Sequence, residues 1–140
     1  MTGRDFLTFA KTLHASDDEA ARRSSVSRAY YALYHHVRDC LRSSGIPVTT
    51  GPEAHKKMIR YLKNSEIEEA KYVGDQMDDI RKKRNDADYE LDNSSFNKNT
   101  CASYCRMTEA MFSQLDAVDK QLLRTRLSEY AIRVNEPHNC

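Results

Sequence analysis

The chain has 140 residues, of which 31 % are charged and 39 % hydrophobic, with four glycines and three prolines. This length suits one domain with a real core, and so few turn-forming residues favour long helices. No run of 18 apolar residues occurs, and residues 1–9 do not resemble a signal peptide, so we expect a cytoplasmic protein without a membrane span. The net charge of +1 implies no bulk attraction to nucleic acid, so any site for a polyanion must be local.

Hydrophobic periodicity predicts about five helices and no strand. They are expected over residues 4–14, from a capping box at Ser16 and Glu19 to about Ser43, from Pro52 past Leu62, from a capping box at Ser65 and Glu68 to about residue 91, and from before Tyr104 toward Ile132. The predicted class is therefore all-α, a four- to five-helix up-and-down bundle. We expect residues 1–140 to form a single domain with its core in residues 16–127 and a flexible tail at 133–140.

The fourth predicted helix carries an arginine on its apolar face. The positions spaced by three and four residues are Ile67, Ala70, Val73, Met77, Ile80, Arg84, Ala87 and Leu91. A buried cation is unfavourable unless it is paired and hydrogen-bonded. Asp88 follows Arg84 by one helical turn and is the candidate partner. Arg84 therefore either forms a structural pair with Asp88 or binds an anion.

The second predicted helix combines small and aromatic residues. Tyr30 and Tyr34 are expected in the core, where their hydroxyl groups still need hydrogen-bond partners. Arg28, Tyr31 and His35 recur at spacings of three and four residues and share a second, more polar face. Ordinary packing beside a solvated edge is the simpler interpretation of this pattern.

The cysteines do not indicate a metal centre. Cys101 and Cys105 lie one helical turn apart, which would suit two metal ligands, but no matching second pair is present. Cysteine also buries readily as a small apolar residue, and the chain shows no secretory signal. We therefore expect reduced thiols in the core, no metal site and no cofactor.

Three segments, taken in order, resemble the HEPN family (higher eukaryotes and prokaryotes nucleotide-binding). They are residues 27–35 (SRAYYALYH), His55 with Ile59 and Leu62, and residues 84–89 (RNDADY). The resemblance covers roughly residues 20–127 and is nearest to the small stand-alone bacterial and archaeal branch whose last motif ends in Ala-Asp-Tyr. It implies a HEPN-like helical bundle that forms a homodimer, with two copies of the late motif meeting across a symmetric interface.

Active members of that family are metal-independent ribonucleases, often toxins paired with a nucleotidyltransferase antitoxin, or components of antiviral defence. Their late motif begins with Arg and a polar residue and ends with His. Arg84 and Asn85 match this motif, but Tyr89 stands where the His would be. A phenol with a reference pKa of about 10 is a poor base at neutral pH.

Three functional hypotheses follow from the resemblance. The first is an RNA endonuclease with Arg84, Asn85 and Tyr89 at the site and His35 as the base. The second is a protein that binds RNA or a nucleotide without cutting it. The third is a catalytically silent module for dimerisation or partner binding. In the first two hypotheses the phosphate contacts come from the cations Arg28, Arg81, Lys83 and Arg84.

Overall fold

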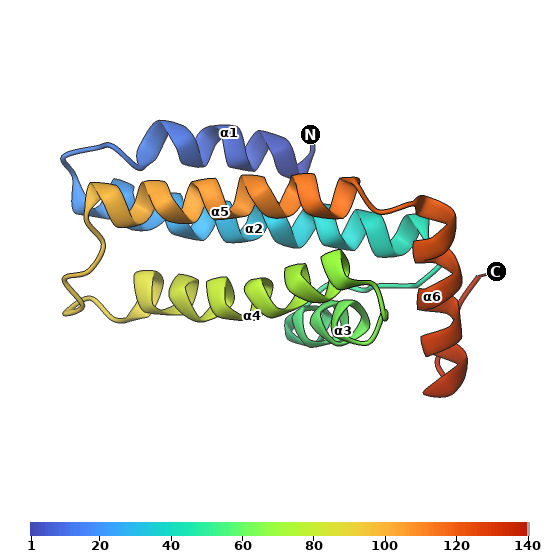
Figure 1. Ribbon diagram of the computed structural model, residues 1–140. Helices are drawn as coiled ribbons and strands as arrows, with labels where there is room; N and C mark the ends of the chain where they lie inside the picture. Colours follow the sequence, from blue (N-terminus) through green and yellow to red (C-terminus); the bar gives the residue numbers. More distant parts are fainter. Residues whose placement is uncertain (140) are drawn as a thin grey trace. The chain divides into compact units, whose positions relative to one another are not determined.

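The computed structural model describes residues 1–139, and within that range it is all-α, with six helices and no strand (Figure 1). The helices are α1 (Gly3–Leu13), α2 (Glu19–Ser43), α3 (Pro52–Lys63), α4 (Glu68–Tyr89), α5 (Lys98–Asp116) and α6 (Lys120–Arg133). Among these helices, none combines the length and apolar character that crossing a membrane requires.

The last predicted helix is wrong as a single element, because it is two helices. α5 ends at Asp116, and Asp119 caps the start of α6 by accepting a hydrogen bond from the Leu122 amide at 2.8 Å. Leu122, near the start of α6, is 42 % exposed, and Ile132, toward which the predicted helix extends, is 64 % exposed. The cap satisfies amide groups that a continuous helix would bond to the preceding turn, so it favours a new start.

Two helices begin two residues later than their capping boxes predict. Before α2, the Asp18 carboxylate accepts from the Ala20 amide at 3.0 Å. Before α4, the Ser65 hydroxyl donates to the Leu62 carbonyl at 2.8 Å and accepts from the Ile67 amide at 3.3 Å. These short turns use the polar side chains locally and delay the first helical residue.

The described residues divide into two compact units. The first unit comprises residues 1–36 and 77–112, so it contains α1, part of α2, part of α4 and most of α5. In Figure 1 these helical segments lie alongside one another. α1 approaches α2 closely, because a Cβ on Gly3 would lie 2.5 Å from the Ala32 carbonyl oxygen.

Two small clusters fill part of the core of the first unit. One cluster comprises Val26, Ala87, Phe96 and Cys101, and the other comprises Ala10, Ala29 and Cys105. Both cysteines are buried, and burial raises the pKa of the Cys105 thiol to about 11. They therefore pack as small apolar groups. Among the described residues, no group of three metal-ligating side chains lies together.

The second unit comprises residues 37–76 and the described part of 113–140. Within it α3 contacts α6, where the Tyr61 and Tyr130 rings meet edge to face at a centroid distance of 4.9 Å. The segment after α6, expected to be flexible, contacts the rest of this unit. Glu136 accepts from Arg60 and Tyr61, and the Asn139 amide donates to the Gly45 carbonyl at 2.7 Å. Cys140, the end of that predicted tail, lies outside the described residues.

Candidate phosphate-binding site

Arg84 lies on the buried face of α4, as its spacing predicts. Its side chain is 12 % exposed, while Ile80 and Ala87, one turn before and after it, are 0 % and 2 % exposed. The prediction is wrong for Leu91, which is 72 % exposed because α4 ends at Tyr89. The apolar neighbours of Arg84 exclude most water, so its charge is poorly solvated and favours an anionic partner.

Two tyrosines of α2 hold the guanidinium of Arg84 against their rings. The Arg84 Cζ atom lies 5.7 Å from the centroid of Tyr30 and 5.4 Å from that of Tyr31. Both distances are in the range of cation–π interactions. Burial raises the pKa of Tyr30 despite the opposing charges of Arg81 and Arg84, so this tyrosine is a neutral phenol at physiological pH. The rings fix the cation in place without neutralising it.

The polar contacts of Arg84 leave part of its hydrogen-bonding capacity unused. Its Nη1 lies 3.5 Å from Oδ2 of Asp88, and the Ser27 hydroxyl donates to that same oxygen at 3.3 Å. The Arg84 Nε is buried and has no hydrogen-bond partner among the described residues. A guanidinium carries five N–H groups in a planar fork, so a single long contact to Asp88 does not saturate it. We call Arg84, Asp88, Ser27, Tyr30 and Tyr31 the Arg84 site.

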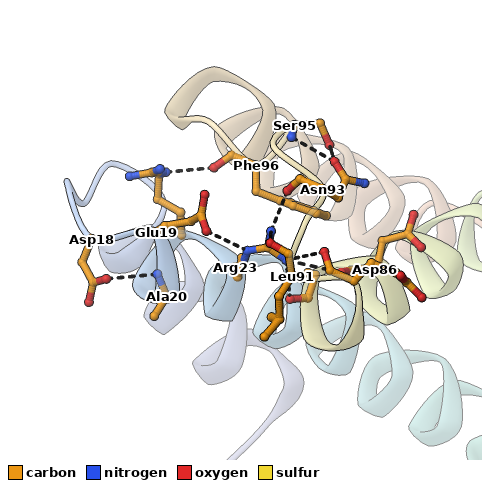
Figure 2. Close-up of polar contacts among 12 residues, drawn as sticks. Asp18, Glu19, Ala20, Arg23, Asp86, Leu91, Asn93, Ser95 and Phe96 are labelled. Carbon is orange, nitrogen blue, oxygen red and sulfur yellow. Dashed lines mark hydrogen bonds and ion pairs between the residues drawn. The ribbon is translucent and has the colours of Figure 1, made fainter.

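A second arginine, Arg23 of α2, anchors the end of the helix that carries this site. Its guanidinium donates to five backbone carbonyls at and just beyond the end of α4, and Figure 2 shows part of this arrangement. The carbonyls belong to Asp86, Ala87, Glu90, Leu91 and Asn93. Arg23 is 6 % exposed, and its Cζ lies 4.8 Å from the centroid of the Phe96 ring. The last carbonyls of a helix lack partners within it and carry partial negative charge, so a buried cation suits them.

Sequence reasoning missed Arg23, although a signal was present. Arg23 precedes Val26 by three residues and Tyr30 by seven, so it lies on the same apolar stripe of α2. The spacing of three and four residues that predicts burial of Tyr30 and Tyr34 therefore extends back through Val26 to an arginine on a buried face, as at Arg84.

The other predicted site residues are distributed around the late motif. Asn85 and Lys83 are exposed, and Tyr89 is 71 % exposed. Arg81 is partly buried, and its Nε lacks a hydrogen-bond partner among the described residues. Arg81 precedes Arg84 by one turn, so the two cations follow each other along α4.

Arg28 and His35 gather instead around Phe6 of α1. The Arg28 Cζ lies 5.4 Å from the Phe6 ring centroid, and the His35 ring meets Phe6 edge to face at 5.2 Å. His35 also contacts Tyr34 at 5.2 Å, and Tyr34 contacts Tyr31 at 5.9 Å. A row of rings thus connects the imidazole to a tyrosine of the Arg84 site.

No family model matches the chain, and neither the curated proteins nor the solved structures show a significant similarity to it. The geometry by itself defines an all-α protein with a partly desolvated arginine between tyrosine rings. Such an arrangement suits a phosphate or carboxylate, because arginine binds these groups through paired N–H donors.

Proposed function

We propose that the protein is a HEPN-type RNA-binding protein in which Arg84 receives a phosphate group of RNA. The observation that supports this most is the state of the Arg84 side chain. It is 12 % exposed, its guanidinium lies against two rings, and its buried Nε lacks a partner among the described residues. A cation prepared in this way loses little side-chain entropy when an anion arrives.

Binding requires a phosphate oxygen to compete with Asp88 for Arg84. The Asp88 side chain is 31 % exposed and lies 3.5 Å from Nη1, so the existing contact is long and partly screened by solvent. Asp88 would keep its hydrogen bond from Ser27 after the exchange. Arg81, one turn earlier, supplies a second cation for the neighbouring phosphate.

The proposal includes a HEPN-like up-and-down bundle and a symmetric homodimer built around the end of α4. Tyr89 and Leu91 support the dimer, since they are 71 % and 72 % exposed although both side chains are largely apolar. Contiguous exposed apolar surface marks interaction sites, and we propose that these two side chains form part of one. A two-fold axis near them would bring two Arg84 sites toward one another.

Metal-independent RNA cleavage is the second candidate, because His35 follows Tyr31 of the Arg84 site by one turn of α2. In this reaction the ribose 2′-hydroxyl attacks the adjacent phosphorus, the bond to the 5′-oxygen breaks as that oxygen takes a proton from water, and a 2′,3′-cyclic phosphate and a free 5′-hydroxyl form. His35 would take the proton from the 2′-hydroxyl, and Arg84 would stabilise charge on the phosphoryl oxygens. Asn85 and Tyr89, both exposed on α4, would position the RNA. This activity would suit a toxin or a defence component with a nucleotidyltransferase-type partner.

The test is an RNA-binding and cleavage assay in excess EDTA with three proteins: the wild type, Arg84→Met and Arg106→Met. Arg106 is an exposed arginine of α5 and serves as the control for loss of one charge. Arg84→Met should weaken binding of a single-stranded RNA by about 10-fold or more and reduce the salt dependence by about one phosphate contact. The control should bind like the wild type. Equal affinity of all three proteins would reject the Arg84 site.

The same reactions, run also with His35→Ala and resolved on a denaturing gel, distinguish the two candidates. Fragments with 2′,3′-cyclic phosphate ends that disappear in both Arg84→Met and His35→Ala would establish the ribonuclease. If the wild type binds the RNA and the RNA stays intact, the protein binds RNA without cleaving it.

A further inference from the structure

The unit of residues 37–76 and 113–139 contains a pocket with a charged lining, and this pocket uses no residue of the Arg84 site. A pocket of about 480 Å³ opens there beside α3. Its charged lining consists of three cations, Lys56, Lys57 and Arg60, and two carboxylates, Glu53 and Glu136. The volume falls within the range of pockets that bind small molecules.

One wall of this pocket already holds an anion, which is the carboxylate of Glu136. The Arg60 Nη2 donates to its two oxygens at 3.2 and 2.9 Å, and the Tyr61 hydroxyl donates to it at 2.7 Å. The hydrogen bond from Arg60 is the main reason that the pKa of Glu136 lies below its ordinary value. The Tyr130 hydroxyl accepts from Arg60 Nη1 at 3.1 Å and so orients the guanidinium. These donors form a ready receptor for an oxyanion.

The two lysines add positive charge to the pocket, and the side-chain hydrogen bonds to Glu136 come from Arg60 and Tyr61 instead. The Lys57 Nζ donates to the Pro47 carbonyl at 2.5 Å and lies 5.7 Å from the Tyr61 ring centroid. These partners are a carbonyl and a ring, so the lysine keeps its net charge. Lys56 is exposed at the same pocket, and Thr49 adds a hydroxyl group to the lining.

We propose that this pocket binds a small phosphorylated molecule and that its phosphate displaces Glu136 from Arg60. A phosphate carries more negative charge than a carboxylate and three acceptor oxygens, so it can engage Arg60 and a lysine together. Glu136 belongs to the segment after α6 and acts as a built-in competitor. Once Glu136 leaves, the lining holds three cations against Glu53 alone, and the pocket favours an anion more strongly.

The experiment is isothermal titration calorimetry with pyrophosphate as the probe, on the full chain. Lys57→Met removes the ammonium but keeps the apolar stem, and it should weaken binding by about 10-fold or more. Glu136→Gln retains a side-chain oxygen that accepts from Tyr61, so the fold is kept, and loss of the competing charge should strengthen binding several-fold. Lys71→Met is the matched control, because Lys71 pairs with Glu68 outside the pocket lining, and it should bind like the wild type.

Three results would overturn the proposal: no heat of binding in any variant, equal affinity of wild type and Lys57→Met, or weaker binding in Glu136→Gln. Displacement of bound pyrophosphate by a lower concentration of a short single-stranded RNA would also overturn the proposal. The preferred phosphate would then belong to a nucleic acid. Lys57→Met should bind single-stranded RNA like the wild type, because Lys57 lies outside the Arg84 site, so failure of this proposal is distinguishable from failure of the Arg84 site.

Discussion

Arg23 and Arg84 are both arginines on core-facing stripes, and their surroundings give them different roles. Arg23 donates to five carbonyls and is 6 % exposed, so its guanidinium is fully engaged by the protein. Arg84 has a carboxylate contact at 3.5 Å, two ring faces and a buried Nε without a partner among the described residues. A buried arginine with unused donors is a better candidate for a ligand site than one whose donors are occupied.

Asp88→Asn tests whether the contact between Arg84 and Asp88 is a structural pair or a replaceable one. Because Asp88 is 31 % exposed and the pair is 3.5 Å apart, the substitution should lower the free energy of unfolding by no more than about 1 kcal/mol. Loss of the competing carboxylate should raise RNA affinity several-fold. Urea unfolding and RNA titration measure the two effects. A loss of about 3 kcal/mol or more, with unchanged RNA affinity, would identify a structural pair.

At the scale of the elements, the end of α4 depends on a side chain from α2. The last turn of α4 contains no basic residue of its own. Arg23 supplies the missing positive charge from α2, and Phe96 covers its guanidinium. Since Arg84 and Tyr89 lie on α4, Arg23 fixes their position without belonging to the Arg84 site.

Arg23→Met should therefore destabilise the protein strongly. It leaves carbonyl groups in a partly buried place without their donor, which we expect to lower the free energy of unfolding by about 2–4 kcal/mol. Arg106→Met, at an exposed position, should change it by less than about 0.5 kcal/mol. Chemical denaturation gives the magnitude, and faster hydrogen exchange at the amides of residues 86–90 would locate it. Similar stability of the two variants would exclude this anchoring role.

The break between α5 and α6 depends on the cap at Asp119. Asp119→Ala removes the acceptor for the Leu122 amide, and we expect a loss of about 1 kcal/mol in the free energy of unfolding. Asp119→Asn keeps an acceptor oxygen and should retain most of the stability. Thermal unfolding of both variants measures the difference. An alanine variant as stable as the asparagine variant would show that the cap contributes little.

These elements show which parts of the molecule the sequence could predict. The buried residues of α2 and α4 recur every three or four positions. The sequence alone therefore predicts the burial of Tyr30, Met77 and Ile80 and the placement of Arg84 on the apolar face of its helix. The break before α6 lacked a glycine or proline and depended on one aspartate. The pairing of Arg60 with Glu136 joins residues 76 positions apart, a separation that no local pattern encodes.

At the scale of the whole molecule, the net charge is only +1, so the attraction of RNA depends on where individual charged side chains lie. Bulk attraction is too weak to draw RNA to this chain, so binding must come from a few positioned cations. A symmetric dimer would double the number of such cations that a single RNA meets. The proposed dimer through the end of α4 would therefore strengthen the proposed RNA binding.

Leu91→Asp tests that dimer. A charge placed at the centre of a symmetric apolar contact meets its own copy across the two-fold axis, so like-charge repulsion and desolvation should both oppose association. Leu91 is 72 % exposed, so the substitution should leave the fold of the monomer intact. Ile132→Asp is the matched control, because Ile132 is an aliphatic residue that is 64 % exposed at the end of α6. Sedimentation velocity at high micromolar concentration should show dimers for the wild type and the control, and monomers for Leu91→Asp. A wild type that sediments as a monomer, or a Leu91→Asp variant that remains a dimer, would remove the end of α4 from the interface and leave each Arg84 site to act alone.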